Sequence, residues 1–208
     1  DLEFVVADAE ADGTQYLGQY LSADISGLNN PEDAELRSVD DGDVDSLKQV
    51  VDIFNGTTSV DTTDLSAGQY VITDNASGQP VGSNDVLFEL VEQDLDAEWD
   101  DDSIENEGSD TTTTVELSSS LRNNYDVIVT SEDLDYEDLT SIFADEYASG
   151  SPYDSADDDE IVIESADGEI DADFADIGTG NYSFTFDVVD STVEASDSID
   201  VEEEAQGE

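Results

Sequence analysis

Carboxylates are the side chains of this sequence whose number and spacing could do chemistry. Asp and Glu account for 58 of the 208 residues, and the chain has no His and no Cys. Closely spaced carboxylate and carbonyl oxygens are the ligands that Ca²⁺ and other hard cations prefer. The candidate cation ligands form four clusters: Asp8, Glu10 and Asp12; Asp40, Asp41 and Asp43; Asp100, Asp101 and Asp102; and Asp157, Asp158 and Asp159.

Each cluster has two interpretations. A hydrated acidic surface is the simpler one for any single cluster, because runs of like charge usually face the solvent. The alternative is a Ca²⁺ or other divalent ion, bound at one of the clusters or at the joint between domains. The first cluster resembles the opening of a calcium-binding loop, but its twelfth position is Gln19, where that loop has Glu.

Signals of catalysis are nearly absent from the sequence. Without His or Cys the chain has neither an imidazole base nor a thiol nucleophile. Carboxylate pairs can hydrolyse glycosides, but at this acid content such pairs carry little information. A sugar-binding groove would also usually present several aromatic rings, and the chain has 1 Trp. We therefore predict that the protein is not an enzyme and requires no organic cofactor.

The formal net charge is −55, with 3 basic residues, Arg37, Lys48 and Arg122. Such a chain repels itself, and molar salt shortens the screening length to about 3 Å. We expect a fold that needs high monovalent salt and does not bind nucleic acid or anionic lipid. Intrinsic disorder is the rival interpretation, but 7 Phe, 8 Tyr and 37% hydrophobic residues favour a folded core.

A repeated segment gives the domain organisation. Residues 64–72 and 176–184 align in register, Gly68 with Gly180 and Tyr70 with Tyr182. An acid, an aliphatic residue, Gly and then Tyr before a strand are typical of a tyrosine corner, in which the Tyr hydroxyl returns to the upstream backbone. The sequence predicts an all-β protein of two tandem Ig-like Greek-key β-sandwiches, residues 1–92 and 93–203, with a tail at 204–208. The joint has no Gly-, Pro- or Ser-rich run, so we expect it to be semi-rigid.

Alternating apolar residues predict the strands. Residues 47–54 fit a helical face as well as a strand, but their β-branched residues and the Asn55-Gly56 dipeptide favour a strand and hairpin turn. One short helix is expected near 136–147, capped by Asp135. The strands are expected at 2–7, 15–23, 34–39, 47–54, 59–61, 70–73, 86–91, 95–99, 111–117, 125–129, 161–163, 182–189 and 198–201.

Three Asn-X-Ser/Thr sequons are candidate N-glycosylation sites. Asn75 is the best candidate because it follows a strand in a polar loop. Asn55 could equally serve as the first residue of the hairpin turn. Asn181 lies inside the second corner, where an exposed residue of almost any kind would fit.

Several segments resemble the repeated Ig-like domains of haloarchaeal cell-surface glycoproteins of the S-layer type. They lie at 15–19, 61–70, 88–99 and 122–127, and the resemblance spans most of the chain. It implies an exported, often N-glycosylated structural module of a cell-surface lattice. The secretion signal, the Thr-rich stalk and the membrane anchor of that family are not found in these residues, so attachment to a cell is an expectation only.

Two functions follow as expectations. The first is a structural subunit of an extracellular surface layer or filament, whose copies, or neighbouring surface-protein domains, assemble through salt- and cation-dependent contacts of acidic faces. The alternative is an adhesin, or a module that binds carbohydrate or a protein partner. Neither involves insertion of this segment into a membrane, because no apolar run approaches 20 residues.

Overall fold

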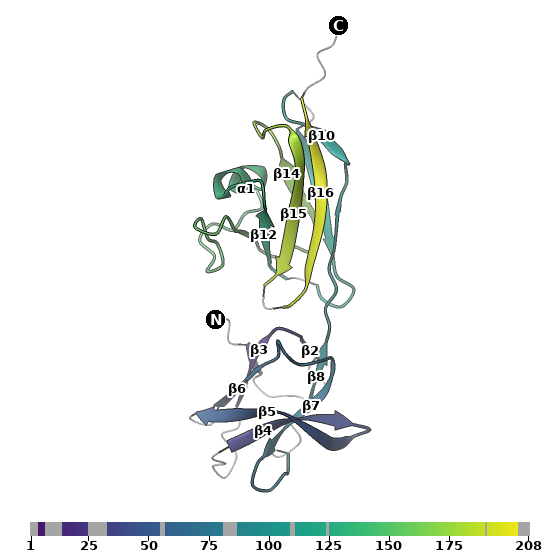
Figure 1. The fold of residues 1–208 in the computed structure, drawn as a ribbon, viewed down its shortest axis with the longest axis vertical. Coiled ribbons are helices and arrows are strands. Elements are labelled where there is room, and N and C mark those ends of the chain that lie inside the picture. Colours follow the sequence, from purple (N-terminus) through teal and green to yellow (C-terminus); the bar gives the residue numbers. More distant parts are fainter. Residues whose placement is uncertain are drawn as a thin grey trace. The chain divides into compact units, whose positions relative to one another are not determined.

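The computed structural model describes residues 4–6, 14–24, 33–54, 57–80, 87–108, 111–123, 125–189 and 191–203. Its contacts cluster into two compact units: the first comprises residues 1–92 and 190–192, and the second comprises residues 93–189 and 193–208. The protein is all-β, with sheets packed as sandwiches and, within these ranges, one short helix (Figure 1). Within the described residues, no helix has the length and apolar character needed to cross a membrane.

The first unit contains eight strands in the order β1-β3-β6-β5-β4-β7-β8-β2. The long strand β5 lies between two halves of this sheet, β1-β3-β6 and β4-β7-β8-β2. It pairs with β4 over most of its length and with β6 at its end. The strands are β1 (Phe4–Val6), β2 (Thr14–Tyr16), β3 (Tyr20–Asp24), β4 (Asp33–Asp40), β5 (Asp43–Phe54), β6 (Thr57–Asp61), β7 (Gly68–Asp74) and β8 (Leu87–Val91).

One apolar cluster joins the two halves of the first unit. Leu21 and Val60 come from β3 and β6, whereas Leu36, Ile72 and Leu90 come from β4, β7 and β8. All five side chains are at most 3% exposed. Burial of these apolar side chains holds the two halves together.

The second unit is a sandwich of two separate sheets. Five strands follow the order β10-β16-β15-β12-β13, and three follow β14-β11-β9. The strands are β9 (Asp96–Trp99), β10 (Ser103–Glu105), β11 (Thr112–Ser118), β12 (Val127–Ser131), β13 (Ile161–Ile163), β14 (Gly168–Asp173), β15 (Gly180–Val188) and β16 (Glu194–Glu202).

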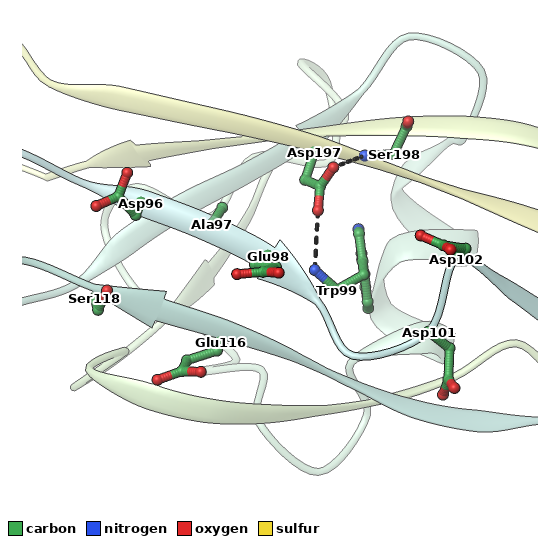
Figure 2. Close-up of a pocket in the computed structure, with 10 residues that line it drawn as sticks. All are labelled: Asp96, Ala97, Glu98, Trp99, Asp101, Asp102, Glu116, Ser118, Asp197 and Ser198. Atoms are coloured by element: carbon green, nitrogen blue, oxygen red, sulfur yellow. Dashed lines mark hydrogen bonds between the residues drawn. The ribbon is translucent and has the colours of Figure 1, made fainter.

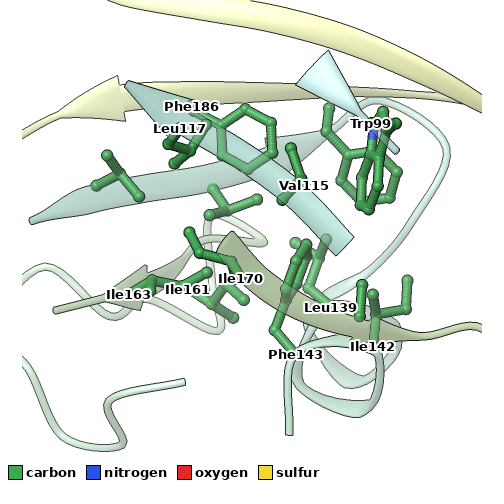
Figure 3. Close-up of a cluster of buried hydrophobic side chains, with 14 of the residues drawn as sticks. Trp99, Val115, Leu117, Leu139, Ile142, Phe143, Ile161, Ile163, Ile170 and Phe186 are labelled. Atoms are coloured by element: carbon green, nitrogen blue, oxygen red, sulfur yellow. The ribbon is translucent and has the colours of Figure 1, made fainter. Parts of the chain in front are cut away.

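The core of the second unit lies between these sheets (Figure 3). Alternation is regular on β11, where Thr113, Val115 and Leu117 are buried and the residues between them are not. Trp99 packs edge-on against Phe174 and Phe184, with ring centroids 5.7 and 5.2 Å apart. Such aromatic pairs add roughly 0.5–1.5 kcal/mol each beyond the burial of their area.

Helix α1 (Tyr136–Ile142) is where the sequence places it, and it is shorter than expected. Asp135 and Asp138 form a capping box, in which each carboxylate accepts the other residue's backbone N–H. Leu139 and Ile142 are buried in the core. The helix ends at Ile142, and Tyr147 instead bridges to Ile163 of β13.

Both tyrosine corners are confirmed. The Tyr70 hydroxyl donates to the Ser66 carbonyl at 2.7 Å, and the Tyr182 hydroxyl donates to the Gly178 carbonyl at 2.9 Å. In each case the ring folds back over the preceding turn onto the carbonyl four residues upstream. Gly68 has φ +150°, a left-handed conformation that favours Gly at the start of β7.

Other expectations about the strands were wrong. Residues 15–23 are not one strand with a bulge, because the chain turns at Gly18 with φ +96°. Its two parts pair with different strands, β2 with β8 and β3 with β6. Strands β10 and β14 were not predicted at all; β10 is three residues long and pairs in parallel with the distant β16. The expected turn at Asn55 and Gly56 lies outside the described residues.

The corner hydrogen bond gives a test specific to one unit. Replacing Tyr70 with Phe removes one hydrogen bond of a 3% exposed side chain and should cost the first unit about 1 kcal/mol of unfolding free energy. Trp99, the single Trp, reports on the second unit alone. We expect the variant's denaturation curve measured by circular dichroism to shift to lower denaturant, and the curve measured by Trp fluorescence to stay unchanged. A shift of both curves would contradict the independence of the two corners.

Candidate functional site

The candidate site is an acidic groove of about 650 Å³ on the second unit (Figure 2). Strand β9 supplies one wall, β11 a second, and Asp197 of β16 reaches across to the backbone of Trp99. The Trp99 N–H donates to Asp197 Oδ2 at 2.9 Å, which connects the two sheets at the groove. Six of the lining residues carry carboxylates: Asp96, Glu98, Asp101, Asp102, Glu116 and Asp197.

The chemistry of the groove is that of an anionic surface. Although Trp99 lines it, the residue is only 6% exposed, and its ring stacks in the core. The indole Nε1 is buried, without a hydrogen-bond acceptor among the described residues. The groove therefore presents carboxylates and no exposed aromatic face on which a sugar could stack.

The third acidic cluster contributes to this groove in part. Asp101 and Asp102 line it, whereas Asp100 does not. Asp101 Oδ2 accepts the Thr113 hydroxyl at 2.7 Å, and Figure 2 shows its carboxylate directed away from that of Asp102. These adjacent residues therefore do not converge on a single point.

The second cluster surrounds a hairpin turn. Asp40 and Asp43 form the last pair of the β4–β5 ladder, and Asp41 and Gly42 connect them with φ of +50° and +85°. Positive φ at both central residues is the geometry of a type I′ turn, for which Asp-Gly is a favoured sequence. The local role of these residues is to close the hairpin.

Two of the three carboxylates of the fourth cluster accept hydrogen bonds from different protein donors. Asp159 Oδ1 accepts the Tyr136 N–H at 3.0 Å, at the start of α1. Asp158 Oδ2 accepts the Ser155 hydroxyl at 2.7 Å. Asp157 is exposed. The hydrogen bonds of Asp158 and Asp159 hold the loop between α1 and β13.

A third acid, Asp154, anchors the same loop and was not singled out in the sequence. Its Oδ2 lies 2.8 Å from the Tyr147 hydroxyl oxygen and 3.1 Å from that of Tyr136, and the two hydroxyls also contact each other. Because the two tyrosines have only two hydroxyl hydrogens, these three contacts share two donated hydrogens. The bond to Tyr147, burial and Asp154 together raise the pKa of Tyr136 above its usual range. Tyr136 therefore remains a protonated donor at neutral pH.

The first cluster, Asp8, Glu10 and Asp12, lies outside the described residues. Within those that are described, no three acidic side chains gather in an arrangement that could hold a metal ion. Binding of a divalent ion stays a prediction from the sequence.

The sequons differ in their surroundings. Asn75 is exposed in the turn after β7, where Asp74 Oδ1 accepts the N–H groups of Ala76 and Ser77. Asn181 lies within β15, and its Nδ2 donates to Asp200 Oδ1 at 2.7 Å across the ladder. Asn55 is outside the described residues.

Strand register creates a carboxylate pair that the sequence alone did not reveal. Asp187 on β15 lies directly opposite Glu194 on β16. Burial, the charge of Glu194 and a hydrogen bond with it raise the pKa of Asp187. Burial and the charges of Asp158 and Asp187 likewise raise the pKa of Glu160. Asp187, Glu194 and Glu160 have no regular spacing in the sequence, so their proximity appears only in the folded structure.

No protein-family model matches this sequence, and a search of curated protein sequences found no match. Solved structures with some likeness include the titin I-band fragment I67–I69, at 12% identity and a TM-score of 0.31 over 94% of this chain. Domains 4 and 5 of the S-layer protein SbsC match at 14% identity and a TM-score of 0.27, covering 67% of this chain and 68% of that one. The mouse nectin-like molecule 4 ectodomain matches at 9% and 0.28, covering 84% and 56%. The chain spans 63% of the titin fragment.

Removing the charge opposite Asp187 should stabilise the second unit. When folding raises the pKa of a carboxyl group, the folded state loses stability as the pH rises through that pKa and regains it on acidification. Glu194→Gln should therefore raise the unfolding free energy on the order of 0.5 kcal/mol at neutral pH, with little difference below the pKa of Asp187. Trp fluorescence during denaturation at several pH values measures it. A gain in unfolding free energy that is the same at every pH would contradict the pairing of Asp187 with Glu194.

Glycan attachment should distinguish the sequons. We expect glycopeptide mass spectrometry of the native protein to find a glycan on Asn75, because its side chain is exposed in a turn. Asn181 should be unmodified, since its amide nitrogen is bonded within a paired strand. A glycan on Asn181 and none on Asn75 would reverse this assignment.

Proposed function

We propose that this chain is a structural module of an extracellular surface layer or filament of a haloarchaeal cell. Its copies, or neighbouring domains of the same surface, assemble through salt- and cation-dependent contacts between acidic β-sandwich faces. The observation that carries the proposal is the combination of two buried apolar cores with a chain that has 58 acidic residues and only 3 basic ones.

The mechanism is screening of like charges. At low ionic strength two such surfaces repel over roughly 10 Å, whereas at 1 M salt the screening length falls to about 3 Å. Modules can then approach closely enough for short-range contacts to form. Divalent cations act more strongly per ion and are attracted to surfaces dense in carboxylates, such as the groove lined by β9, β11 and Asp197.

The fold supports this role through its rigidity. Within each unit, ladders of hydrogen bonds run across the sheets, and buried side chains fill the interior. The acidic residues lie mainly on the outer positions of the strands, as on β16, where Glu194, Asp200 and Glu202 are exposed. A module of this kind can present charge to its neighbours without placing that charge in the core.

A binding module is the second candidate, and the groove of about 650 Å³ is the observation that favours it. Its carboxylates could accept hydrogen bonds from sugar hydroxyls or attract a basic peptide. The buried state of Trp99 weighs against a sugar site of the stacking type. We propose no catalytic role, because the sequence supplies no imidazole or thiol group.

Assembly in solution tests the proposal. Full-length protein in molar NaCl should form oligomers or sheets when millimolar Ca²⁺ is added, and a chelator should disperse them. Light scattering and negative-stain electron microscopy would follow both steps. A monomer that ignores salt, Ca²⁺ and chelator, yet binds a glycan array, would contradict the structural role and favour the adhesin.

A further inference from the structure

The chain contains none of the sulfur side chains that oxidants usually attack first. It has no Cys and no Met, and its oxidisable aromatic residues are 8 Tyr and 1 Trp. Trp99 is only 6% exposed, and its indole Nε1 has no hydrogen-bond acceptor among the described residues. Oxidation of this protein therefore falls on tyrosine side chains, and the surroundings of each phenol decide which of them reacts.

Two tyrosines meet at their hydroxyl ends. Tyr136 is the first residue of α1, and Tyr147 follows that helix and bridges to Ile163 of β13. Their hydroxyls contact each other, and their rings lie edge to face with centroids 6.2 Å apart. Both residues are half-buried, so an oxidant in solution can approach them. Among the ring contacts of the described residues, this is the one between two tyrosines.

Asp154 supplies a proton acceptor to this pair. Its Oδ2 lies 2.8 Å from the Tyr147 hydroxyl oxygen and 3.1 Å from that of Tyr136. The contact between the two hydroxyls uses at most one of their two hydrogens, so at least one phenol donates to the carboxylate. Asp154 Oδ1 is buried and has no partner in the described part of the chain, which leaves the carboxylate with unused acceptor capacity.

Three other tyrosine hydroxyls have no carboxylate acceptor among the described residues. Those of Tyr70 and Tyr182 donate to backbone carbonyls, which are weak bases. That of Tyr125 is buried without a partner in the same part of the chain. Since a phenol that loses an electron also loses its proton, a hydrogen-bonded carboxylate makes its oxidation easier. Tyr136 and Tyr147 are therefore better placed than these three to lose an electron.

We propose that Tyr136 and Tyr147 are a site of oxidative cross-linking, at which a one-electron oxidant joins helix α1 covalently to the segment that follows it. The proposal concerns a covalent modification within one chain. It is independent of the assembly proposed above, because it needs no second copy and no bound cation.

The electrons and protons of the reaction balance. The oxidant takes one electron from each ring, and the two phenolic protons pass one after the other to the Asp154 carboxylate and then to water. The two phenoxyl radicals combine through a bond between the ring carbons that adjoin their oxygen-bearing carbons. The hydrogens on those two carbons move to the oxygens and restore both phenols. The product is dityrosine, and the net change is the loss of two hydrogen atoms.

The cross-link acts in this chain as a disulfide acts in others. Without Cys the protein has no disulfide. The two tyrosines are 11 residues apart, so the new bond closes a short loop. That loop contains Phe143, whose ring stacks on Trp99 in the core. Because closing a loop restricts the unfolded chain, the cross-linked protein is harder to unfold.

Photochemical oxidation followed by peptide mapping tests the site. Photogenerated tris(bipyridine)ruthenium(III) is the one-electron oxidant, and the full chain is kept dilute in molar NaCl so that cross-links form within one chain. A protease that cuts after Asp and Glu separates the two tyrosines, because Glu137 and Asp145 lie between them. We expect dityrosine fluorescence and a linked pair of peptides that contain Tyr136 and Tyr147, with two hydrogens lost. Consumption of tyrosine without this linked pair would overturn the proposal.

Matched variants identify the partners. Tyr136→Phe and Tyr147→Phe should each remove most of the dityrosine fluorescence, whereas Tyr153→Phe should leave it unchanged. Tyr153 is also half-buried and precedes Asp154, but it takes no part in the hydrogen bonds of the pair. Circular dichroism checks the fold of each variant. Fluorescence that survives equally in all three variants would show that other tyrosines couple, and would contradict the assignment.

Asp154→Asn tests the proton acceptor separately. The amide keeps the size of the side chain but takes up no proton at neutral pH, so the cross-link should form roughly tenfold more slowly or worse. A rate equal to that of the wild type would remove Asp154 from the proposal. Purified cross-linked protein should also retain its native Trp fluorescence to higher denaturant than the untreated chain. An unchanged midpoint would rule out a stabilising role for the bond.

Discussion

Repulsion among carboxylates is the constraint on which the rest of this structure depends. A net charge of −55 on 208 residues opposes compaction, and 3 basic residues cannot offset it. What opposes the repulsion is burial of aliphatic and aromatic side chains in two clusters. β-Strands suit this division, because alternation can direct carboxylates outward while neighbouring residues fill the core, as on β16.

Many acidic side chains also make local hydrogen bonds that stabilise the structure, which a count of charges does not show. Asp135 and Asp138 cap the helix, Asp154 holds two tyrosines, and Asp197 connects β16 to β9. At Asp94, hydrogen bonds from Ser120 and Ser119 lower the pKa of the carboxyl and favour its ionised form. Part of the abundance of Asp therefore serves turn and cap geometry.

The sequence predicted what is local. Tyrosine corners, the capped helix and most strand positions follow from periodicity and turn residues, and the structure confirms them. The preference for a strand at 47–54 was correct, and the apparent helical spacing of Leu47 and Val50 reflects the bulged register of β5. Local sequence patterns could not predict which distant strands pair. Strands β10 and β14, the Asp187–Glu194 pair and the acidic groove all depend on that pairing. The acidic clusters looked alike in the sequence, and their different partners appear only in three dimensions.

The salt dependence of folding tests the central claim most directly. Unfolding of the full chain by denaturant, followed by circular dichroism and Trp99 fluorescence, can be measured from low to molar NaCl. Sucrose serves as a control, because it stabilises by exclusion from the surface without screening charge. The account predicts a steep gain in unfolding free energy with NaCl in both signals, well beyond that in sucrose. Equal stability at low and molar NaCl, or full β structure without salt, would contradict it.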